Sequence, residues 1–352
     1  MNLFVPIASL EDRTDPEAVR DRFARPLRDL RVSVMDKCNF RCTYCMPRSI
    51  YGDDYAFLGK DERLSFGEIE KVCRSAAALG VTKLRVTGGE PLLRPNLADL
   101  VRRLRGIATV DEIAMTTNGV LLPQSVGDLA RAGLDRVTVS LDTLDAGVFA
   151  RISGGHGDLD AVLAGIDAAR AAELPGGVKI NAVIQRGINE EGVLDLVERF
   201  RGTGVLVRFI EFMDVGNRNG WTAAAVVPSA EIVERIDARH PIEALPPRYP
   251  GEVAVRYRFR DGGGEIGLIS SVTKPFCGDC TRARLSSDGK LYTCLFASSG
   301  MDLRKLLRDG IDDDGLRHVL QKIWRRRTDR YSETRAAHPG QRKKIEMHYI
   351  GG

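Results

Sequence analysis

Apolar and polar residues alternate in six short segments of the chain, and helical patterns separate these segments. The expected strands lie near 30–35, 83–87, 112–116, 136–141, 178–184 and 205–212. Segments with the helical spacing of apolar residues lie between them, near 65–79, 96–105, 123–131, 158–172 and 190–201. Strands that alternate with helices predict an α/β fold with a parallel sheet covered by helices. Right-handed crossovers would curl the six units into an incomplete (β/α)6 barrel of the TIM type.

The pattern changes after a further helical segment at 228–236. Four prolines at 241, 246, 247 and 250 break regular structure and indicate a boundary. Two hairpins follow, at 253–272 around a glycine run and at 283–294 around a second turn, and then two helical segments near 303–308 and 314–327. We therefore expect an extension (1–25), a partial barrel (26–238), a smaller α+β domain that closes it (239–330) and a tail (331–352).

The expected strands carry cations at every second position. Neighbouring strand residues point to opposite faces, so one face of each strand is apolar and should meet the helices. The other face carries Arg31, Lys83, Arg85, Lys179 and Arg208. Burying unpaired cations is unfavourable, which predicts a hollow, wet chamber that receives a strongly anionic ligand. The alternative is that the strands are half-exposed and the cations simply face water.

Composition narrows the class of protein. The 352 residues are 43% hydrophobic and 28% charged, with a net charge of only +4, as in an ordinary soluble protein without a general polyanion-binding surface. No long apolar run predicts a membrane span, and the first residues do not resemble a signal peptide. We expect a cytoplasmic protein, in which seven cysteines favour metal or redox chemistry over disulfides.

Three cysteines follow the first expected strand within eight residues, at Cys38, Cys42 and Cys45. Three thiolates can bind three corners of a four-iron cluster and leave the fourth iron open for chemistry. A structural zinc site is the alternative, but zinc requires a fourth ligand, which the neighbouring sequence lacks. We favour the cluster.

A second triplet consists of Cys277, Cys280 and Cys294. Its spacing alone would also suit zinc if one of the five histidines folded in as a fourth ligand. Arg282 and Arg284 lie two residues apart and should share a strand face beside Cys280. Arginine side chains are well suited to phosphate oxygens.

These motifs together resemble a known family. The first triplet and the segment Gly88-Gly89-Glu90-Pro91 resemble the radical S-adenosylmethionine (SAM) enzymes. The second triplet, the arginines beside it and the terminus Tyr349-Ile350-Gly351-Gly352 are similar to the MoaA family, the GTP cyclases that open molybdenum cofactor biosynthesis. The resemblance runs from about residue 30 to the last residue.

The resemblance implies two 4Fe–4S clusters, one on each triplet, and SAM as cofactor. It implies SAM contacts at Tyr44, Gly89, Thr116, Ser140 and Met213. It implies contacts with the substrate or its triphosphate at Arg31, Lys83, Arg85, Lys179, Arg208, Arg282 and Arg284. The double-glycine terminus, Gly351 and Gly352, is expected to reach the active site.

The implied activity is that of a lyase that converts GTP to 3',8-cyclo-7,8-dihydro-GTP through a deoxyadenosyl radical. The resemblance also implies transfer of the product to a cyclic pyranopterin monophosphate synthase and an electron donor such as flavodoxin. The sequence does not determine the oligomeric state, for which we expect a homodimer. We expect no membrane partner. We expect no nucleic-acid partner either, because the basic segment 322–344 lacks interleaved aromatic residues and is more typical of a solvated helix and tail.

Two alternatives remain from the residues. The first is a peptide-modifying radical SAM enzyme with auxiliary clusters, although such enzymes typically contain more auxiliary cysteines. The second is a zinc-stabilised protein that binds RNA through its basic C-terminal segment.

Overall fold

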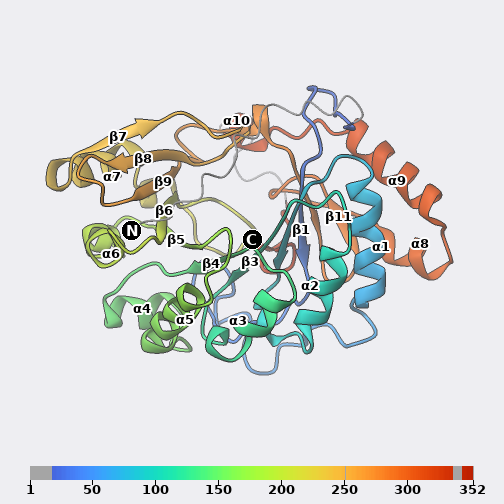
Figure 1. Cartoon of the computed structure of the whole chain (residues 1–352), viewed down its shortest axis with the longest axis horizontal. Helices are drawn as coiled ribbons and strands as arrows, with labels where there is room; N and C mark the ends of the chain where they lie inside the picture. The colour runs from blue at the N-terminus through green and yellow to red at the C-terminus, as the bar shows by residue number, and fades with distance from the viewer. Residues whose placement is uncertain (1–17, 250, 336–342, 352) are drawn as a thin grey trace.

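The computed structural model describes residues 18–249, 251–335 and 343–351. Six parallel strands follow one another in sequence order across the sheet (Figure 1). These strands are β1 (Asp29–Ser33), β2 (Lys83–Thr87), β3 (Glu112–Thr117), β4 (Arg136–Ser140), β5 (Val178–Ile184) and β6 (Leu206–Glu211). All six lie within two residues of the expected segments, so alternation located this part of the sheet correctly.

Helices connect the strands and cover the outer face of the sheet (Figure 1). They are α1 (Phe66–Ala77), α2 (Leu97–Arg105), α3 (Leu122–Arg131), α4 (Ala146–Ile152), α5 (Leu159–Ala171), α6 (Val193–Phe200) and α7 (Ser229–Arg239). The sequence analysis missed α4, which is short and begins at the capping side chain of Asp145. Ser65 and Glu68 form a reciprocal capping box that fixes the start of α1.

The apolar face of each strand forms the core beneath these helices. Val32, Leu84 and Val137 have no exposed surface, and Cys73 of α1 is equally buried among them. Cys73 is therefore a small core residue, as its position in the helical pattern indicated. With the apolar face covered, the polar face of the sheet must line the inside of the curve.

The C-terminal region extends the same sheet at both edges. Strand β9 (Glu265–Ile269) pairs in parallel with β6, and β10 (Arg282–Leu285) pairs in parallel with β1. Beyond these strands lie β7 (Ile242–Leu245) and β8 (Val255–Phe259) on one side, and β11 (Lys290–Tyr292) and β12 (Met301–Asp302) on the other.

The two expected hairpins are present, as β8–β9 and β10–β11. The sequence did not predict that each hairpin would add a parallel strand to the barrel sheet. The parallel arc therefore contains eight strands, but it stays open, because β9 and β10 lie at opposite ends of the arc and pair with β8 and β11 instead of each other. The expected architecture, an incomplete barrel completed by a C-terminal α+β region, is confirmed.

The last helices pack against the start of the chain. Helix α9 (Asp313–Arg325) lies against α1, and α8 (Leu303–Arg308) precedes it (Figure 1). The buried indole of Trp324 donates a hydrogen bond of 3.0 Å to the carbonyl of Arg25. Residues 18–25, assigned to the extension by sequence, are thus tied to the C-terminal region.

The final helix and the tail bind one carboxylate. Arg335, after α10 (Tyr331–Thr334), donates to Asp214 Oδ1 at 2.9 Å, and Lys344 Nζ lies 2.7 Å from Asp214 Oδ2. Part of the basic segment 322–344 therefore faces the protein instead of solvent. None of the helices in the described ranges is long and apolar enough to cross a membrane.

Candidate functional site

The first cysteine triplet lies in the loop that leaves the carboxyl end of β1. The buried side chain of Arg41 organises this loop by donating hydrogen bonds to the carbonyls of Cys38 at 2.7 Å and Tyr51 at 2.5 Å. Cys38, Cys42 and Cys45 are all partly buried and form no disulfide. A folded loop with three free thiols at the mouth of the sheet matches the expected cluster site.

The thiols of this loop are placed where ionisation requires a compensating positive charge. Burial raises the pKa of the Cys38 thiol to about 12, and the Glu90 carboxylate adds to the rise. Burial and the neighbouring thiols also raise the pKa of Cys42 and Cys45. Three free thiols in one folded loop match three corners of a cluster.

Gly88 and Gly89 pack directly against the backbone of the cysteine loop. A Cβ at Gly88 would lie 2.5 Å from the carbonyl oxygen of Met35, and one at Gly89 would lie 2.4 Å from that of Lys37. Gly89 also donates a hydrogen bond of 2.6 Å to Met35. The motif alone suggests that glycine here allows a ligand to approach. The structure gives a second reason, since only glycine lets the two loops touch.

Glu90 is a residue that sequence reasoning missed. Its buried carboxylate accepts hydrogen bonds from the backbone of Asn118 at 2.8 Å and from Thr117 Oγ1 at 2.8 Å. Burial raises its pKa to about 7 despite these donors. Asn118 in turn donates to Asn39 beside Cys38. The glutamate therefore joins the end of β3 to the cysteine loop, and the only sequence signal for it was its place in the Gly-Gly-Glu-Pro motif.

The side chains expected to contact SAM lie at the carboxyl ends of successive strands. Tyr44, in the cysteine loop, donates a hydrogen bond of 2.7 Å to Asp142, just past β4. Thr116 of β3 accepts a hydrogen bond from Arg85 at 3.2 Å, and Ser140 is the last residue of β4. Met213 follows β6 by two residues. Active-site loops of this fold class collect at this edge, so the residues share one end of the barrel.

Three arginines form a row across adjacent strands of the inner face. Arg31 of β1 is in register with Arg284 of β10 on one side and with Arg85 of β2 on the other. None of the hydrogen bonds or ion pairs between described residues involves the Arg31 side chain. Burial, together with Arg284 and Arg85, holds the pKa of Arg31 well below its usual value. Arg31 therefore has no ion-pair partner in the part of the chain that the structure describes.

The other expected cations lie on the same inner face. Burial and neighbouring cations lower the pKa of Arg85 to about 10 and of Arg208 to about 9. Burial and the nearby Arg136 lower the pKa of Lys179 to about 6. Gly267 makes room for Arg208, since a Cβ there would lie 3.0 Å from its side chain. The cations are partly buried and repel one another, so they do not simply face bulk water.

Sequence analysis overlooked three further charged side chains on the inner face, two of which are carboxylates. Glu112 of β3 lies 2.7 Å from Lys83 and also pairs with the buried Arg136 of β4. Asp29 of β1 accepts a hydrogen bond from Thr281 at 3.1 Å. Glu112, Asp29 and Arg136 all follow from the strand alternation that located the other cations. The inner face still carries more cations than carboxylates among the residues described.

The second triplet lies at the amino end of β10. Cys277 and Cys280 border the 3-10 helix η4 (Cys277–Asp279), and Cys294 follows β11, which returns antiparallel to β10. Arg282 donates to the Cys280 sulfur at 3.6 Å. Burial alone would raise the pKa of the Cys280 thiol, but Arg282 and Arg327 outweigh burial and lower the pKa to about 6. This sulfur is electrostatically prepared to be a thiolate.

The two triplets lie at opposite ends of the neighbouring strands β1 and β10. Cys38 leaves the carboxyl end of β1, whereas Cys280 enters the amino end of the neighbouring β10. Strand β1 spans about 13 Å from Asp29 to Ser33, at roughly 3.3 Å per residue. The row of Arg284, Arg31 and Arg85 lies midway between the two ends.

The C-terminal tail enters the same space. Arg284 donates to the carbonyl oxygens of Gly351 and of Ile350, the latter at 3.5 Å. A Cβ at Gly351 would lie 1.9 Å from Thr87 Oγ1 of β2, and the residue has a φ of +68°. The ring of His348 packs edge-on against Tyr51, which follows the cysteine triplet, with the ring centroids 4.7 Å apart. The tail therefore lies between the first triplet and the arginine row; Gly352 lies outside the described residues.

Comparison with known proteins agrees with this arrangement. Residues 32–200 match the Radical SAM superfamily, and residues 205–333 match the family described as Molybdenum Cofactor Synthesis C. GTP 3',8-cyclase of Xanthomonas campestris pv. campestris (strain B100) is 55% identical over 334 residues, 95% of this chain and 97% of the relative. The enzymes of the same name from Acidothermus cellulolyticus and Staphylococcus haemolyticus are 51% and 48% identical, over 96% and 95% of this chain and 99% of each relative.

Solved structures support the fold. SuiB of Streptococcus suis bound to S-adenosylmethionine has a TM-score of 0.58 and 16% identity, covering 84% of this chain and 68% of that one. SuiB bound to its precursor peptide SuiA gives 0.59 and 15%, covering 85% and 64%. These likenesses concern the fold alone. SAM and an iron–sulfur cluster are the cofactors of the Radical SAM superfamily. This chain belongs to the GTP 3',8-cyclase family of radical SAM enzymes.

Proposed function

We propose that the chain converts GTP to 3',8-cyclo-7,8-dihydro-GTP, the first step of molybdenum cofactor biosynthesis. The observation that carries this proposal is the arginine row of Arg284, Arg31 and Arg85, which lies between two cysteine triplets at opposite ends of strands β1 and β10. Cations that lack anions match a triphosphate. A nucleotide bound there would be close to both triplets at once.

The first triplet and the SAM site form the reactive end of the chamber. Cys38, Cys42 and Cys45 would hold a 4Fe–4S cluster, and Tyr44, Gly89, Thr116, Ser140 and Met213 would surround SAM. When bound and reduced, this pair of cofactors would supply the radical chemistry that removes hydrogen from the ribose 3' carbon of GTP. The chain fixes the geometry: Tyr44 is held by Asp142, and Gly89 is held by the backbone of Met35.

The second triplet forms the guanine end. Cys277, Cys280 and Cys294 would hold a second 4Fe–4S cluster with one iron open to the base. The Cys280 thiol fits a metal ligand, because two arginines donate to its sulfur and its pKa lies near 6. Arg282 and Arg284 extend from this end toward the middle of the chamber on one strand.

The triphosphate of GTP would bind among the cations of the inner face. We assign this contact to Arg31, Lys83, Arg85, Lys179, Arg208, Arg282 and Arg284. Arginine forks bind phosphate oxygens in pairs, and Lys179 would regain its proton beside them. Gly351 would complete the wall beside Thr87 and exclude water during the reaction, and we assign Gly352 to the same active site by the resemblance alone.

The cellular setting is part of the same proposal. We place the enzyme in the cytoplasm, with its product passed to a cyclic pyranopterin monophosphate synthase and electrons supplied by a donor such as flavodoxin. We also propose a homodimer, and the division into extension, barrel, C-terminal region and tail at residues 25, 238 and 330. The seven cysteines are all unpaired, as a reducing compartment requires.

Anaerobic reconstitution, followed by incubation with SAM, GTP and a reductant, tests this function. We expect deoxyadenosine and the cyclic product to form together, and only with GTP. Cys38→Ser should abolish both, whereas Cys277→Ser should retain the first cluster and lose the cyclic product. Cys73→Ser provides the control, because this buried thiol lies outside both triplets. Equal product from Cys277→Ser and the wild type would contradict the second cluster.

A further inference from the structure

Three buried charged side chains surround the second triplet, and none of them belongs to the proposed substrate or cluster sites. Asp21 precedes β1, Arg25 follows it by four residues, and Arg327 comes just after α9. Their side chains are at most 2% exposed. Burying two guanidinium groups and a carboxylate is costly unless the geometry uses every charge.

Asp21 joins the two arginines. Its Oδ2 atom lies 2.7 Å from Arg25 Nε and 3.2 Å from Arg327 NH1. Its Oδ1 atom accepts hydrogen bonds from the backbone of Phe23 and Arg25. The carboxylate is therefore fully used, and it holds both guanidinium groups against the cysteine loops.

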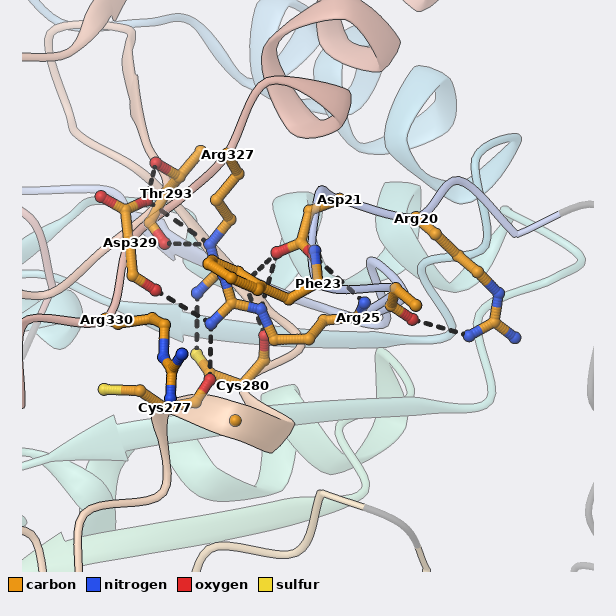
Figure 2. Close-up of polar contacts among 12 residues, drawn as sticks. Arg20, Asp21, Phe23, Arg25, Cys277, Cys280, Thr293, Arg327, Asp329 and Arg330 are labelled. Carbon is orange, nitrogen blue, oxygen red and sulfur yellow. Dashed lines mark hydrogen bonds and ion pairs between the residues drawn. The ribbon is translucent and has the colours of Figure 1, made fainter. Parts of the chain in front are cut away.

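The arginines then reach all three cysteine positions (Figure 2). Arg25 donates to the carbonyl of Cys277 at 2.5 Å, and Arg327 donates to the carbonyl of Cys280 at 2.6 Å. Arg327 Nε donates to the carbonyl of Thr293, next to Cys294, at 3.0 Å. Figure 2 shows both arginines directed at this loop, with Asp21 beside them.

One contact goes to sulfur. Arg327 NH2 lies 3.1 Å from Cys280 Sγ, and the guanidinium also stacks over the ring of Trp324 at 4.5 Å. The guanidinium group of Arg327 is thus held in one orientation by several contacts. Hydrogen bonds and positive charge at a ligand sulfur favour the reduced state of an iron–sulfur cluster, because they stabilise the added negative charge.

We propose that Asp21, Arg25 and Arg327 form a clamp that positions the ligands of the second cluster, and that Arg327 raises the reduction potential of that cluster through Cys280. This inference rests on the proposed second cluster. Arg327 is a positioning residue, because it touches the cysteine and not the substrate. The segment 18–25 then belongs to the cluster site, although the sequence assigned it to an extension.

The test isolates the second cluster. In a parent protein carrying Cys38→Ser, Cys42→Ser and Cys45→Ser, iron content, the electron paramagnetic resonance spectrum and the midpoint potential report on Cys277, Cys280 and Cys294 alone. Arg327→Gln should shift the midpoint potential to more negative values and alter the spectrum. Arg327→Lys, which keeps the charge but not the fork, should shift it less. Asp21→Asn should shift it in the opposite direction, because a nearby negative charge is lost.

The matched control is Arg256→Gln, which removes another buried arginine with two carboxylate partners, Glu252 and Glu265, in β8 and its surroundings. It should leave the potential unchanged. Opposite shifts for Arg327→Gln and Asp21→Asn support a direct electrostatic effect of both side chains on the cluster, since general loosening would move both in one direction. An unchanged potential and spectrum in Arg327→Gln overturn the role of Arg327 alone. A parent that binds no iron overturns the second cluster and this inference with it.

Discussion

Arg284 donates a hydrogen bond to the carbonyl oxygen of Gly351, so a cation of the inner sheet holds the last described residue of the chain. The same arginine is in register with Arg31, whose side chain has no partner among the described residues. The tail and the proposed triphosphate site therefore share one side chain. Movement of the tail should therefore change the binding of the triphosphate, and binding of the triphosphate should change the position of the tail.

Gly351→Ala should impair catalysis without unfolding the protein. The new Cβ would lie 1.9 Å from Thr87 Oγ1, so the tail must shift. A displacement of about 1 Å near reacting groups can cost on the order of a hundredfold in rate, and we expect a loss of that size in cyclic product. The melting temperature should change little, since Gly351 lies outside the main hydrophobic cluster.

Gly310→Ala is the control for backbone strain. Gly310 also has a positive φ, of +87°, but no atom lies within 4 Å of the point that a Cβ at this residue would occupy. Wild-type turnover in Gly310→Ala with a large loss in Gly351→Ala supports the tail contact. Equal turnover in both variants would contradict it.

Arg31→Met should stabilise the free protein and weaken GTP binding. Arg31 is surrounded by Arg284, Arg85 and Arg282, so its removal relieves repulsion and raises the melting temperature without ligand. A hydrogen bond to a charged group is worth about 1.5–3 kcal/mol, so affinity for GTP should fall roughly tenfold to a hundredfold. Affinity for guanosine should not change. Calorimetry with both ligands measures the difference.

Arg102→Met serves as the comparison for Arg31→Met. Arg102 pairs with Asp99 on the exposed face of α2, where an ion pair contributes little. A lower melting temperature for Arg31→Met, with unchanged affinity for GTP, would show that Arg31 faces a structural partner instead of the triphosphate.

Glu112→Gln should have the opposite effect. Its carboxylate pairs with Lys83 and Arg136 on the inner face, so its loss increases repulsion and lowers the melting temperature of the free protein. GTP should bind at least as tightly, because phosphate no longer competes with a carboxylate for Lys83. Weaker binding of GTP would indicate that Glu112 orients Lys83 for the substrate.

Lys179 should take up a proton when the protein binds GTP. Burial and the nearby Arg136 and Arg208 lower its pKa to about 6, so the amine is neutral at a pH of about 7.5 in the free protein. Phosphate charge restores the proton. Calorimetry in buffers of different ionisation enthalpy should detect this uptake in the wild type and in Lys60→Met, an exposed control, but not in Lys179→Met.

The lowered pKa of Lys179 also makes the free energy of unfolding depend on pH. Between pH 6 and the usual pKa of lysine near 10.4, the unfolded chain binds one more proton at this position than the folded chain. The contribution of Lys179 to the free energy of unfolding therefore rises with pH across this window, and it is constant below pH 6. Lys179→Met should flatten that slope in denaturant titrations from about pH 6.5 to 9.

Local pattern was enough to predict the strands and most of their inward residues. Alternation in Lys83–Thr87 is a property of five neighbouring residues, and the buried core keeps it in register. It also implied Glu112 and Arg136, which our set of inward charges left out. Family resemblance then supplied roles that spacing could not, such as the expected contact of Tyr44 with SAM.

Long-range pairing could not be predicted in this way. Strand β10 could have paired with β11 alone, and only tertiary packing sets Arg284 beside Arg31. The contact between Asp21 and Arg327 joins residues 306 positions apart, and no periodicity encodes it. The close packing of Gly89 on Lys37 is likewise a matter of three-dimensional fit.

The most direct test of the account follows one hydrogen atom. GTP carrying deuterium at the ribose 3' carbon is incubated anaerobically with SAM, reductant and the reconstituted enzyme. The deuterium content of the deoxyadenosine is then measured by mass spectrometry. A chamber that holds the triphosphate on Arg31 and its neighbours should direct the 3' position toward SAM, so the deoxyadenosine should carry one deuterium. Unlabelled deoxyadenosine formed at the same rate with and without GTP would contradict the account.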